Sequence, residues 1–198
     1  MATTRTAKGD RRRDELARAA ADLVREDGPS ALSHRAVAAR AGVSLSATTY
    51  YYSGLDALAA AAGAALVDDW VAHAEGVLAR VVAAAAPQDA AEVLVDAVLP
   101  PGDDAVLRAH YEQLVTAGRV PALAAALGEG RARLDDVLGC LLAALGSGAR
   151  GRAGDPGPAV VLALVDGAVV AALSEGRDVR AGARDLLHGV LGGAEPLR

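Results

Sequence analysis

Apolar residues recur every three or four positions along most of the chain, which is the spacing of an amphipathic α-helix. The first such stretch covers residues 11–27, with Leu16, Leu23 and Val24 on one face, and Gly28 followed by a proline ends it. Clusters of β-branched and aromatic residues, which are typical of strands, do not interrupt the long stretches. The pattern therefore predicts an all-α protein.

Two shorter helices are predicted next, at residues 34–41 and 45–52. Ser33 and Ser44 stand just before them, where a serine hydroxyl can accept a hydrogen bond from the first helical turn. Gly42 lies between the two helices and can take a positive φ at low cost. Two short helices joined by a tight turn are the pattern of a helix-turn-helix, whose second helix enters the major groove of DNA.

The remainder of the chain predicts longer and more apolar helices, separated by prolines and a glycine-rich segment. They are expected at about 55–85, 88–99, 103–118, 121–145, 158–174 and 180–191.

Two domains are predicted from this organisation. Residues 1–54 form a helix-turn-helix domain that begins with a flexible arm at 1–10, and residues 55–198 form a helical body. Formal net charge is −5, but residues 1–54 carry +3 and the remainder carries −8. A basic piece on an acidic body indicates that only the small piece meets an anionic partner. On charge alone, the alternative is an N-terminal helix with a solvated charged face.

Three of the four tyrosines stand together at Tyr50, Tyr51 and Tyr52. Three successive helical residues span roughly 200°, so they cannot all face inward. Tyr52 follows Thr48 by one turn, and both are expected to point into a small core with Val43. Tyr50 and Tyr51 then face outward, where a phenolic hydroxyl can reach a phosphate. The alternative, in which all three pack against the preceding helix, conflicts with this geometry.

The segment "LSHRAVAARAGVSLSATTYYYSGLDALAAA" resembles the DNA-binding segment of TetR-family transcriptional regulators. The resemblance covers about residues 12–58, from a leading helix that ends in "REDG" to Asp56 and Leu58 at the start of the linking helix. It implies a three-helix DNA-binding domain joined by a long helix to a domain for ligand binding and dimerisation. It also implies a homodimer that binds double-stranded operator DNA and responds to a small-molecule effector.

Carried over residue by residue, the resemblance implies DNA contacts from both short helices and their caps. The residues are Ser33, His34, Arg35, Ser44, Leu45, Ser46, Thr49, Tyr50 and Tyr51. Many members have a lysine or another polar residue where this chain has Leu45, so base readout is expected to be more apolar. Many also have a phosphate-binding lysine where this chain has Leu55. Arg5, Lys8 and residues 11–13 of the arm are expected to compensate.

The last two apolar helices are the predicted dimer interface. The helix at 158–173 is apolar nearly all round, so both of its faces need cover, and the helix at 180–191 carries one apolar stripe. The alternative is that these helices close the core of a monomer. The predicted interface residues are Leu164, Val165, Ala168, Ala172, Ala183, Leu186, Leu187 and Val190.

An effector pocket is expected among the long helices, at polar or aromatic residues that interrupt apolar runs. These residues are Trp70, His73, His110, Tyr111, Gln113 and Asp166. A single histidine or tryptophan on a mixed helix is often a core or partly exposed residue, so only a part of this set is expected to line the cavity.

Catalysis, cofactors and metals find no support in the sequence. Cys140 is the only cysteine, and the four histidines are scattered. A G-x-G-x-x-G match at 146–151 follows a helix rather than a strand, which does not fit a dinucleotide site. No secretory signal is visible, and the apolar run at 158–173 is short for a bilayer and contains Asp166. A cytoplasmic, non-enzymatic protein without a membrane partner is expected.

The sequence thus predicts a ligand-responsive transcriptional regulator, best described as a repressor that a small molecule releases from its operator. An activator of the same fold is the first alternative. A helical enzyme or carrier that contains a helix-turn-helix is the second, and a catalytic constellation in the body would favour it.

Overall fold

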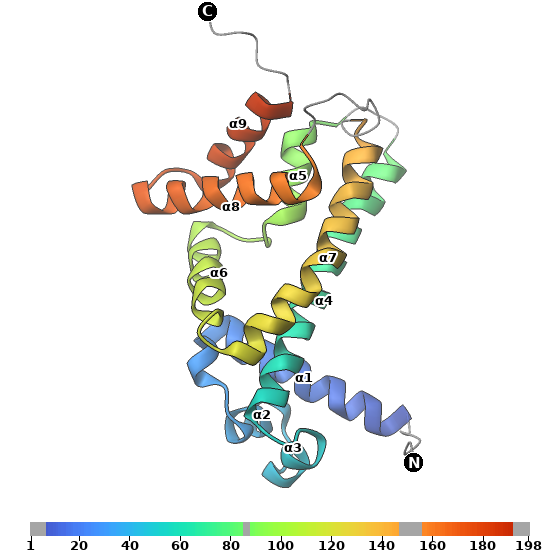
Figure 1. The fold of residues 1–198 in the computed structure, drawn as a ribbon, viewed down its shortest axis with the longest axis vertical. Helices are drawn as coiled ribbons and strands as arrows, with labels where there is room; N and C mark the ends of the chain where they lie inside the picture. Colours follow the sequence, from blue (N-terminus) through green and yellow to red (C-terminus); the bar gives the residue numbers. More distant parts are fainter. Residues whose placement is uncertain (1–6, 85–87, 147–155, 192–198) are drawn as a thin grey trace, which may run out of the picture. The chain divides into compact units, whose positions relative to one another are not determined.

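A computed structural model of the protein describes residues 7–84, 88–146 and 156–191. Every regular element in these residues is helical, which confirms the predicted fold class (Figure 1). The elements are α1 (Ala7–Asp27), the 3-10 helix η1 (Pro29–Ala31), α2 (His34–Ala41), α3 (Leu45–Tyr51), α4 (Leu55–Ala83), α5 (Ala90–Val98), α6 (Asp104–Ala117), α7 (Pro121–Ala144), α8 (Pro158–Glu175) and α9 (Val179–Leu191).

The start of α1 differs from the prediction. Residues 7–10, which were assigned to a flexible arm, are the first turn of α1, and residues 1–6 lie outside the described residues. Asp10 in this turn is favourable because a carboxylate near a helix N-terminus interacts with the exposed N–H groups. The arginines at 11–13 are therefore helical residues. The glycine-rich match at 146–151 falls almost wholly outside the described residues.

Packing divides the chain into two compact units. We call Met1–Asp68 with Ala109–Gly130 the N-terminal unit, and Asp69–Arg108 with Arg131–Arg198 the C-terminal unit. The boundary predicted after residue 54 is based on expected function and differs from this division by packing, so it stays a prediction.

In the N-terminal unit, α1 packs against η1 and α2, and α2 packs against α3. Leu16 of α1, Val37 of α2 and Leu58 near the start of α4 are fully buried in this unit. The beginnings of α4 and α7 also approach each other closely here. A Cβ atom on Gly63 would lie 2.8 Å from the Cβ atom of Ala126, so glycine allows the two helices to touch.

In the C-terminal unit, α8, α9 and α5 pack against one another. Their shared core is aliphatic, with Leu94, Val161 and Val169 fully buried. Two side chains add hydrogen bonds to backbone carbonyls. A His73 Nε2 atom lies 2.7 Å from the Asp96 carbonyl oxygen, and Arg108 donates to the Leu173 carbonyl at 3.0 Å.

Helix α8 is long and apolar enough to cross a membrane by length and composition alone. It is the one helix in the described residues that passes this test, and 28% of it is buried within the protein. A single such helix is weak support for a membrane span, because helices of soluble proteins pass the same test.

Candidate nucleic-acid interface and effector cavity

The turn between α2 and α3 has the geometry that the sequence predicts. The Ser33 hydroxyl accepts a hydrogen bond from the Ala36 amide at 3.1 Å, and the Ser44 hydroxyl accepts one from the Ala47 amide at 3.3 Å. Gly42 ends α2 in the left-handed region, with φ 65° and ψ 35°. This conformation is inexpensive for glycine and lets the chain reverse between the two helices.

Tyr52 anchors the end of α3 inside the N-terminal unit. Its side chain is 2% exposed, and its hydroxyl donates a hydrogen bond to the Arg13 carbonyl at 3.0 Å. The Arg13 guanidinium lies 4.5 Å from the centre of the Tyr52 ring and donates to the Tyr51 carbonyl at 2.9 Å. Burial raises the pKa of the Tyr52 hydroxyl, and the positive charge of Arg13 opposes that shift. Helices α1 and α3 are thus joined at this point.

Thr48 shares the inward face of α3 with Tyr52, as predicted. It is fully buried, and its hydroxyl donates to the Leu45 carbonyl at 2.8 Å. Val43 is only half-buried, so it contributes less to this core than expected.

The outward face of α3 is exposed. Tyr50 is 82% exposed and Leu45 is 47% exposed, while Tyr51 is half-buried. The rings of Tyr50 and Tyr51 meet edge to face, with their centres 5.1 Å apart. Ser46 and Thr49 are exposed on the same helix. The face therefore offers hydroxyl groups, aromatic edges and one aliphatic side chain, which can contact phosphates and base edges.

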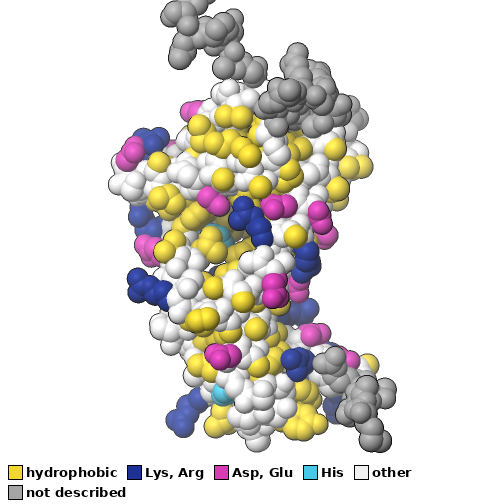
Figure 2. Space-filling model, viewed as in Figure 1, with side chains coloured by type: hydrophobic (Ala, Val, Ile, Leu, Met, Phe, Trp, Pro, Cys, Tyr) yellow, Lys and Arg dark blue, Asp and Glu magenta, His cyan; other side chains and the backbone are white. Residues whose placement is uncertain are grey.

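Two arginines of α2 differ in whether another side chain pairs with them. Arg40 forms an ion pair with Glu26 at 2.7 Å, which raises the pKa of the guanidinium and lowers the pKa of the carboxyl through their hydrogen bond. Arg35 is exposed and has no ion pair or hydrogen bond within the described part of the chain. In Figure 2 the surface over α2 and α3 is mostly white, which marks the backbone and side chains that are neither charged, hydrophobic nor histidine. Arg35 is therefore an exposed cation without a counterion among the described residues.

His34 and the arginines of α1 are less available than the sequence suggested. His34 is half-buried, and its buried Nδ1 atom has no hydrogen-bond partner among the described residues. Arg12 forms an ion pair with Glu15 at 2.8 Å, and Arg13 is held against Tyr52. All three arginines at 11–13 belong to α1, in agreement with the helix predicted from residue 11, so any DNA contact from them would come from a helix rather than from a flexible arm.

The six predicted effector residues are divided between the two units. Trp70, His73 and Asp166 belong to the C-terminal unit, and the other three belong to the N-terminal unit. The side chain of Gln113 lies against Gly28. Burial is the main cause of a lowered His110 pKa, with the nearby positive charge of Arg25 as the second cause. The adjacent Tyr111 is 7% exposed. Their role in effector binding stays a prediction.

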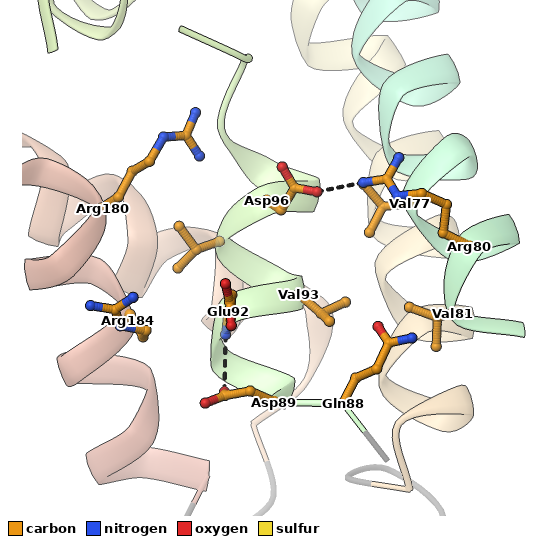
Figure 3. Close-up of a pocket in the computed structure, with 11 residues that line it drawn as sticks. Val77, Arg80, Val81, Gln88, Asp89, Glu92, Val93, Asp96, Arg180 and Arg184 are labelled. Carbon is orange, nitrogen blue, oxygen red and sulfur yellow. Dashed lines mark hydrogen bonds and ion pairs between the residues drawn. The ribbon is translucent and has the colours of Figure 1, made fainter. Parts of the chain in front are cut away.

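A cavity of about 600 Å³ lies within the C-terminal unit, between α4, α5 and α9 (Figure 3). None of the six predicted residues lines it. Its charged lining includes Arg80 from α4, Glu92 from α5, and Arg180 and Arg184 from α9. Sequence reasoning missed these residues because arginines one turn apart on an amphipathic helix usually belong to a solvated face. The spacing of Arg180 and Arg184 shows that they lie on one side of a helix, but it does not show which other helix packs against that side.

The predicted dimer interface falls into two sets of residues. Val165, Ala172, Ala183 and Leu187 are fully buried within the C-terminal unit, so this chain's own helices already cover them. Leu164 and Ala168 are half-buried, while Leu186 and Val190 are 39% and 38% exposed.

The two helices thus have a buried face and an exposed face, and the dimer interface stays a prediction. Helix α8 exposes Val160 and Val170 as well, at 50% and 54%. Figure 2 shows hydrophobic side chains over α8 and α9 among scattered charges. The buried set closes the core of the unit, and the exposed set leaves an apolar surface.

No group of three or more histidine, cysteine, aspartate or glutamate side chains in the described ranges could hold a metal ion. Cys140 is exposed.

A helix-turn-helix in a chain whose described residues form only helices is typical of a DNA-binding transcriptional regulator. Residues 85–193 match the family described as the tetracyclin repressor-like, C-terminal domain. The chain belongs to the TetR family of transcriptional regulators, as the resemblance at residues 12–58 implied. Its members are DNA-binding regulators rather than enzymes.

Solved structures give the same result. A TetR-family member from Streptomyces coelicolor A3 (SCO1917) is 32% identical, with a TM-score of 0.53, and the match covers 90% of this chain and 97% of that chain. A transcriptional regulator from Streptomyces coelicolor A3(2) (SCO7518) is 25% identical, with a TM-score of 0.66 and coverages of 92% and 99%. The multidrug binding protein EbrR, complexed with imidazole, is 28% identical, with a TM-score of 0.60 and coverages of 90% and 94%. No curated protein sequence matches.

Proposed function

We propose that this protein is a cytoplasmic repressor that binds operator DNA as a homodimer and leaves it when a small molecule binds. The observation that carries the proposal is that the end of α3 has one buried side and one exposed side. Tyr52 and Arg13 fix the helix from inside, while Tyr50 is exposed at its outer face and Tyr51 is half-buried beside it. A helix that is rigidly held and exposed on its far side is suited to enter a major groove.

The proposed DNA contacts are of two kinds. Ser33, Arg35, Ser44, Tyr50 and Tyr51 are assigned to the phosphate backbone, because hydroxyls and guanidinium groups bind phosphate oxygens well. Leu45, Ser46 and Thr49 are assigned to base edges. The 47% exposed Leu45 offers an apolar contact for a thymine methyl group. His34 is retained as a weaker contact through the outer edge of its ring.

The proposed dimer uses the exposed apolar side chains of α8 and α9, namely Val160, Val170, Leu186 and Val190. Val160 and Val170 are part of a stripe with Ala163 and Gly167, at spacings of three and four residues on the exposed face of α8. Two copies of this surface could cover each other around a two-fold axis. The dimer would place two recognition helices at successive major grooves, roughly 34–36 Å apart.

Substitution of Val170 by glutamate tests the dimer, because it would place unpaired charge in a desolvated surface. Sedimentation should show monomers. Val82→Glu is the matched control, since Val82 is 71% exposed on α4 and outside the proposed surface. An intact Val170→Glu dimer would remove α8 from the interface.

The small-molecule part of the proposal rests on family likeness and on the cavity. EbrR is a multidrug binding protein and is known in complex with imidazole. For this chain, an effector that binds better to one arrangement of the dimer would shift the population away from the DNA-binding arrangement.

Selection of bound sequences from random DNA duplexes tests the proposed function directly. The enriched sequence should contain two half-sites related by two-fold symmetry, with centres about 10–10.5 base pairs or a multiple of this apart. Transcription from a promoter that overlaps the site should fall when the protein is added. Absence of any enriched sequence would reject DNA binding, and a rise in transcription would identify an activator.

A further inference from the structure

We propose that the cavity between α4, α5 and α9 binds a small aliphatic zwitterion, a molecule with an anionic and a cationic group joined by a short hydrocarbon chain. All residues that line this cavity belong to the C-terminal unit. The inference names the chemistry of the effector and rests on the proposed function for its regulatory meaning. Binding itself can be measured without DNA.

Charges of opposite sign alternate across the cavity (Figure 3). Helix α5 carries Glu92 and Asp96 in the middle. Arg180 and Arg184 come from α9 on one side of α5, and Arg80 comes from α4 on the other. A ligand that lies along this wall therefore meets positive and negative groups in turn.

Some of these charges already have partners. Arg80 forms an ion pair with Asp96 at 2.5 Å. Asp89 accepts hydrogen bonds from the Glu92 amide and from His188, and these bonds lower the pKa of its carboxyl. Arg80 and Asp96 neutralise each other, and the Asp89 carboxylate already accepts hydrogen bonds within the protein, so these groups are poor candidates to recognise a ligand.

Other charges keep unused hydrogen-bonding capacity. Arg180 donates one bond to the Pro100 carbonyl at 2.5 Å, which leaves its positive charge without a counterion among the described residues. The side chains of Arg184 and Glu92 have neither an ion pair nor a hydrogen bond in the part of the chain that the structure describes. The cavity thus offers positive charge on α9 and one negative charge on α5.

This balance favours a ligand of both signs. A neutral apolar ligand would displace water from charged groups without replacing their hydrogen bonds, which is costly. An anion could bind Arg180 and Arg184 but would be repelled by Glu92. A cation could bind Glu92 but would be repelled by the two arginines. A zwitterion can place a carboxylate at the arginines and an ammonium group at Glu92, so that each charge is paired.

The remaining lining determines the body of the ligand. Val77 and Val81 of α4 and Val93 of α5 line the cavity, and Figure 3 places them between these helices. Aromatic residues are absent from the lining, so no stacking platform for a flat ring is present among the residues that form it. The cavity volume of about 600 Å³ is within the usual range for small-molecule sites. A chain of a few methylene groups fits these walls.

Calorimetric titration of the full chain with three probes tests the proposal. The probes are 6-aminohexanoate, hexanoate and hexylamine, which share one carbon chain and differ in charge. We expect 6-aminohexanoate to bind at least about 10-fold more tightly than either of the others, because each additional charged hydrogen bond is worth roughly this factor. Equal or tighter binding of hexanoate or hexylamine, or no binding of 6-aminohexanoate, would overturn the proposal.

Two variants locate the site. Arg184→Gln and Glu92→Gln each remove one unpaired charge, and each should weaken 6-aminohexanoate binding by about 10-fold or more. Arg177→Gln and Glu175→Gln are matched controls, because these residues pair with each other outside the cavity. Both controls should bind like the wild type. Unchanged binding in both cavity variants, or equal losses in the controls, would place the ligand elsewhere.

The same titration separates this inference from the proposed function. If the variants weaken zwitterion binding and the protein selects no DNA sequence, the cavity assignment stands and the repressor proposal fails. If the protein selects an operator and 6-aminohexanoate does not bind, the repressor proposal stands and the cavity assignment fails.

Discussion

The helix-turn-helix and the α8–α9 pair are both helical, but they are stabilised differently. The first depends on a few specific contacts: serine caps, the turn at Gly42, and Tyr52 bound to Arg13. The second depends on aliphatic side chains spread along two helices, and α8 begins without a side-chain cap. We expect the helix-turn-helix to hold its outer surface in a fixed position but to be sensitive to substitution of any one of these contact residues. We expect the α8–α9 pair to accept substitutions on its surface, because its core is stabilised by many aliphatic contacts.

The largest effect is expected from Tyr52→Ala, which removes a buried ring and its hydrogen bond. The loss in free energy of unfolding should be about 3–5 kcal/mol. Amide hydrogen exchange of α1–α3 in the full chain reports this loss locally.

Tyr50→Ala is the matched control for this substitution, because Tyr50 is 82% exposed. It should change stability by no more than about 0.5 kcal/mol. If Tyr50→Ala destabilised these helices as much as Tyr52→Ala, the division of the tyrosines into inner and outer residues would be refuted.

A somewhat smaller effect is expected from Leu187→Ala in α9, which is fully buried among aliphatic neighbours. The cost should be about 2–5 kcal/mol, and its size depends on how well the neighbours close the cavity. Val82→Ala, at a 71% exposed site, serves as the control. Calorimetry should show a lower transition temperature for Leu187→Ala but not for Val82→Ala. A transition temperature for Leu187→Ala equal to that of wild type would mean that the distributed core does not need this side chain.

A third effect concerns the surface of the helix-turn-helix. Arg35→Ala should weaken operator binding for all sequences and lower the slope of log affinity against log salt by about one, because one phosphate contact is lost. Tyr51→Phe removes a neutral hydroxyl and should leave the slope unchanged. Operator affinities of both variants and of the wild type, measured across a salt series, give the three slopes to be compared. A slope that stays the same in the Arg35 variant would show that Arg35 does not neutralise a phosphate.

The smallest effect is a pH dependence caused by His110. Burial lowers its pKa from 6.5 in the folded state, so the unfolded chain binds a proton first as the pH falls. The contribution to stability is fully present above pH 6.5 and is lost as the pH falls from 6.5 through the folded-state pKa. His110→Gln should flatten stability between pH 7.5 and pH 5.5, as measured by urea unfolding. A variant that keeps the full pH dependence of the wild type would assign it to another group.

Local signals explain why the helix-turn-helix was predictable. Caps at Ser33 and Ser44, the turn at Gly42 and the spacing of Thr48 and Tyr52 are all set within a few residues of one another. Each can therefore be read from sequence alone.

The effector cavity could not be predicted in this way. It depends on α4, α5 and α9 meeting one another, and Arg80 and Arg184 are far apart in the chain. The start of α1 was missed for a related reason. A polar N-terminal stretch resembles a flexible arm unless Asp10 and the following helix are considered together.

The bond from Arg13 to the Tyr51 carbonyl has a consequence for redesign of DNA specificity. Arg13 holds a main-chain oxygen, which every amino acid supplies, so this bond does not depend on the side chain at position 51. The outer positions of α3 can therefore be randomised to seek new target sequences while the helix keeps its attachment to α1. A library should vary Leu45, Ser46 and Tyr51 and keep Arg13 and Tyr52 unchanged.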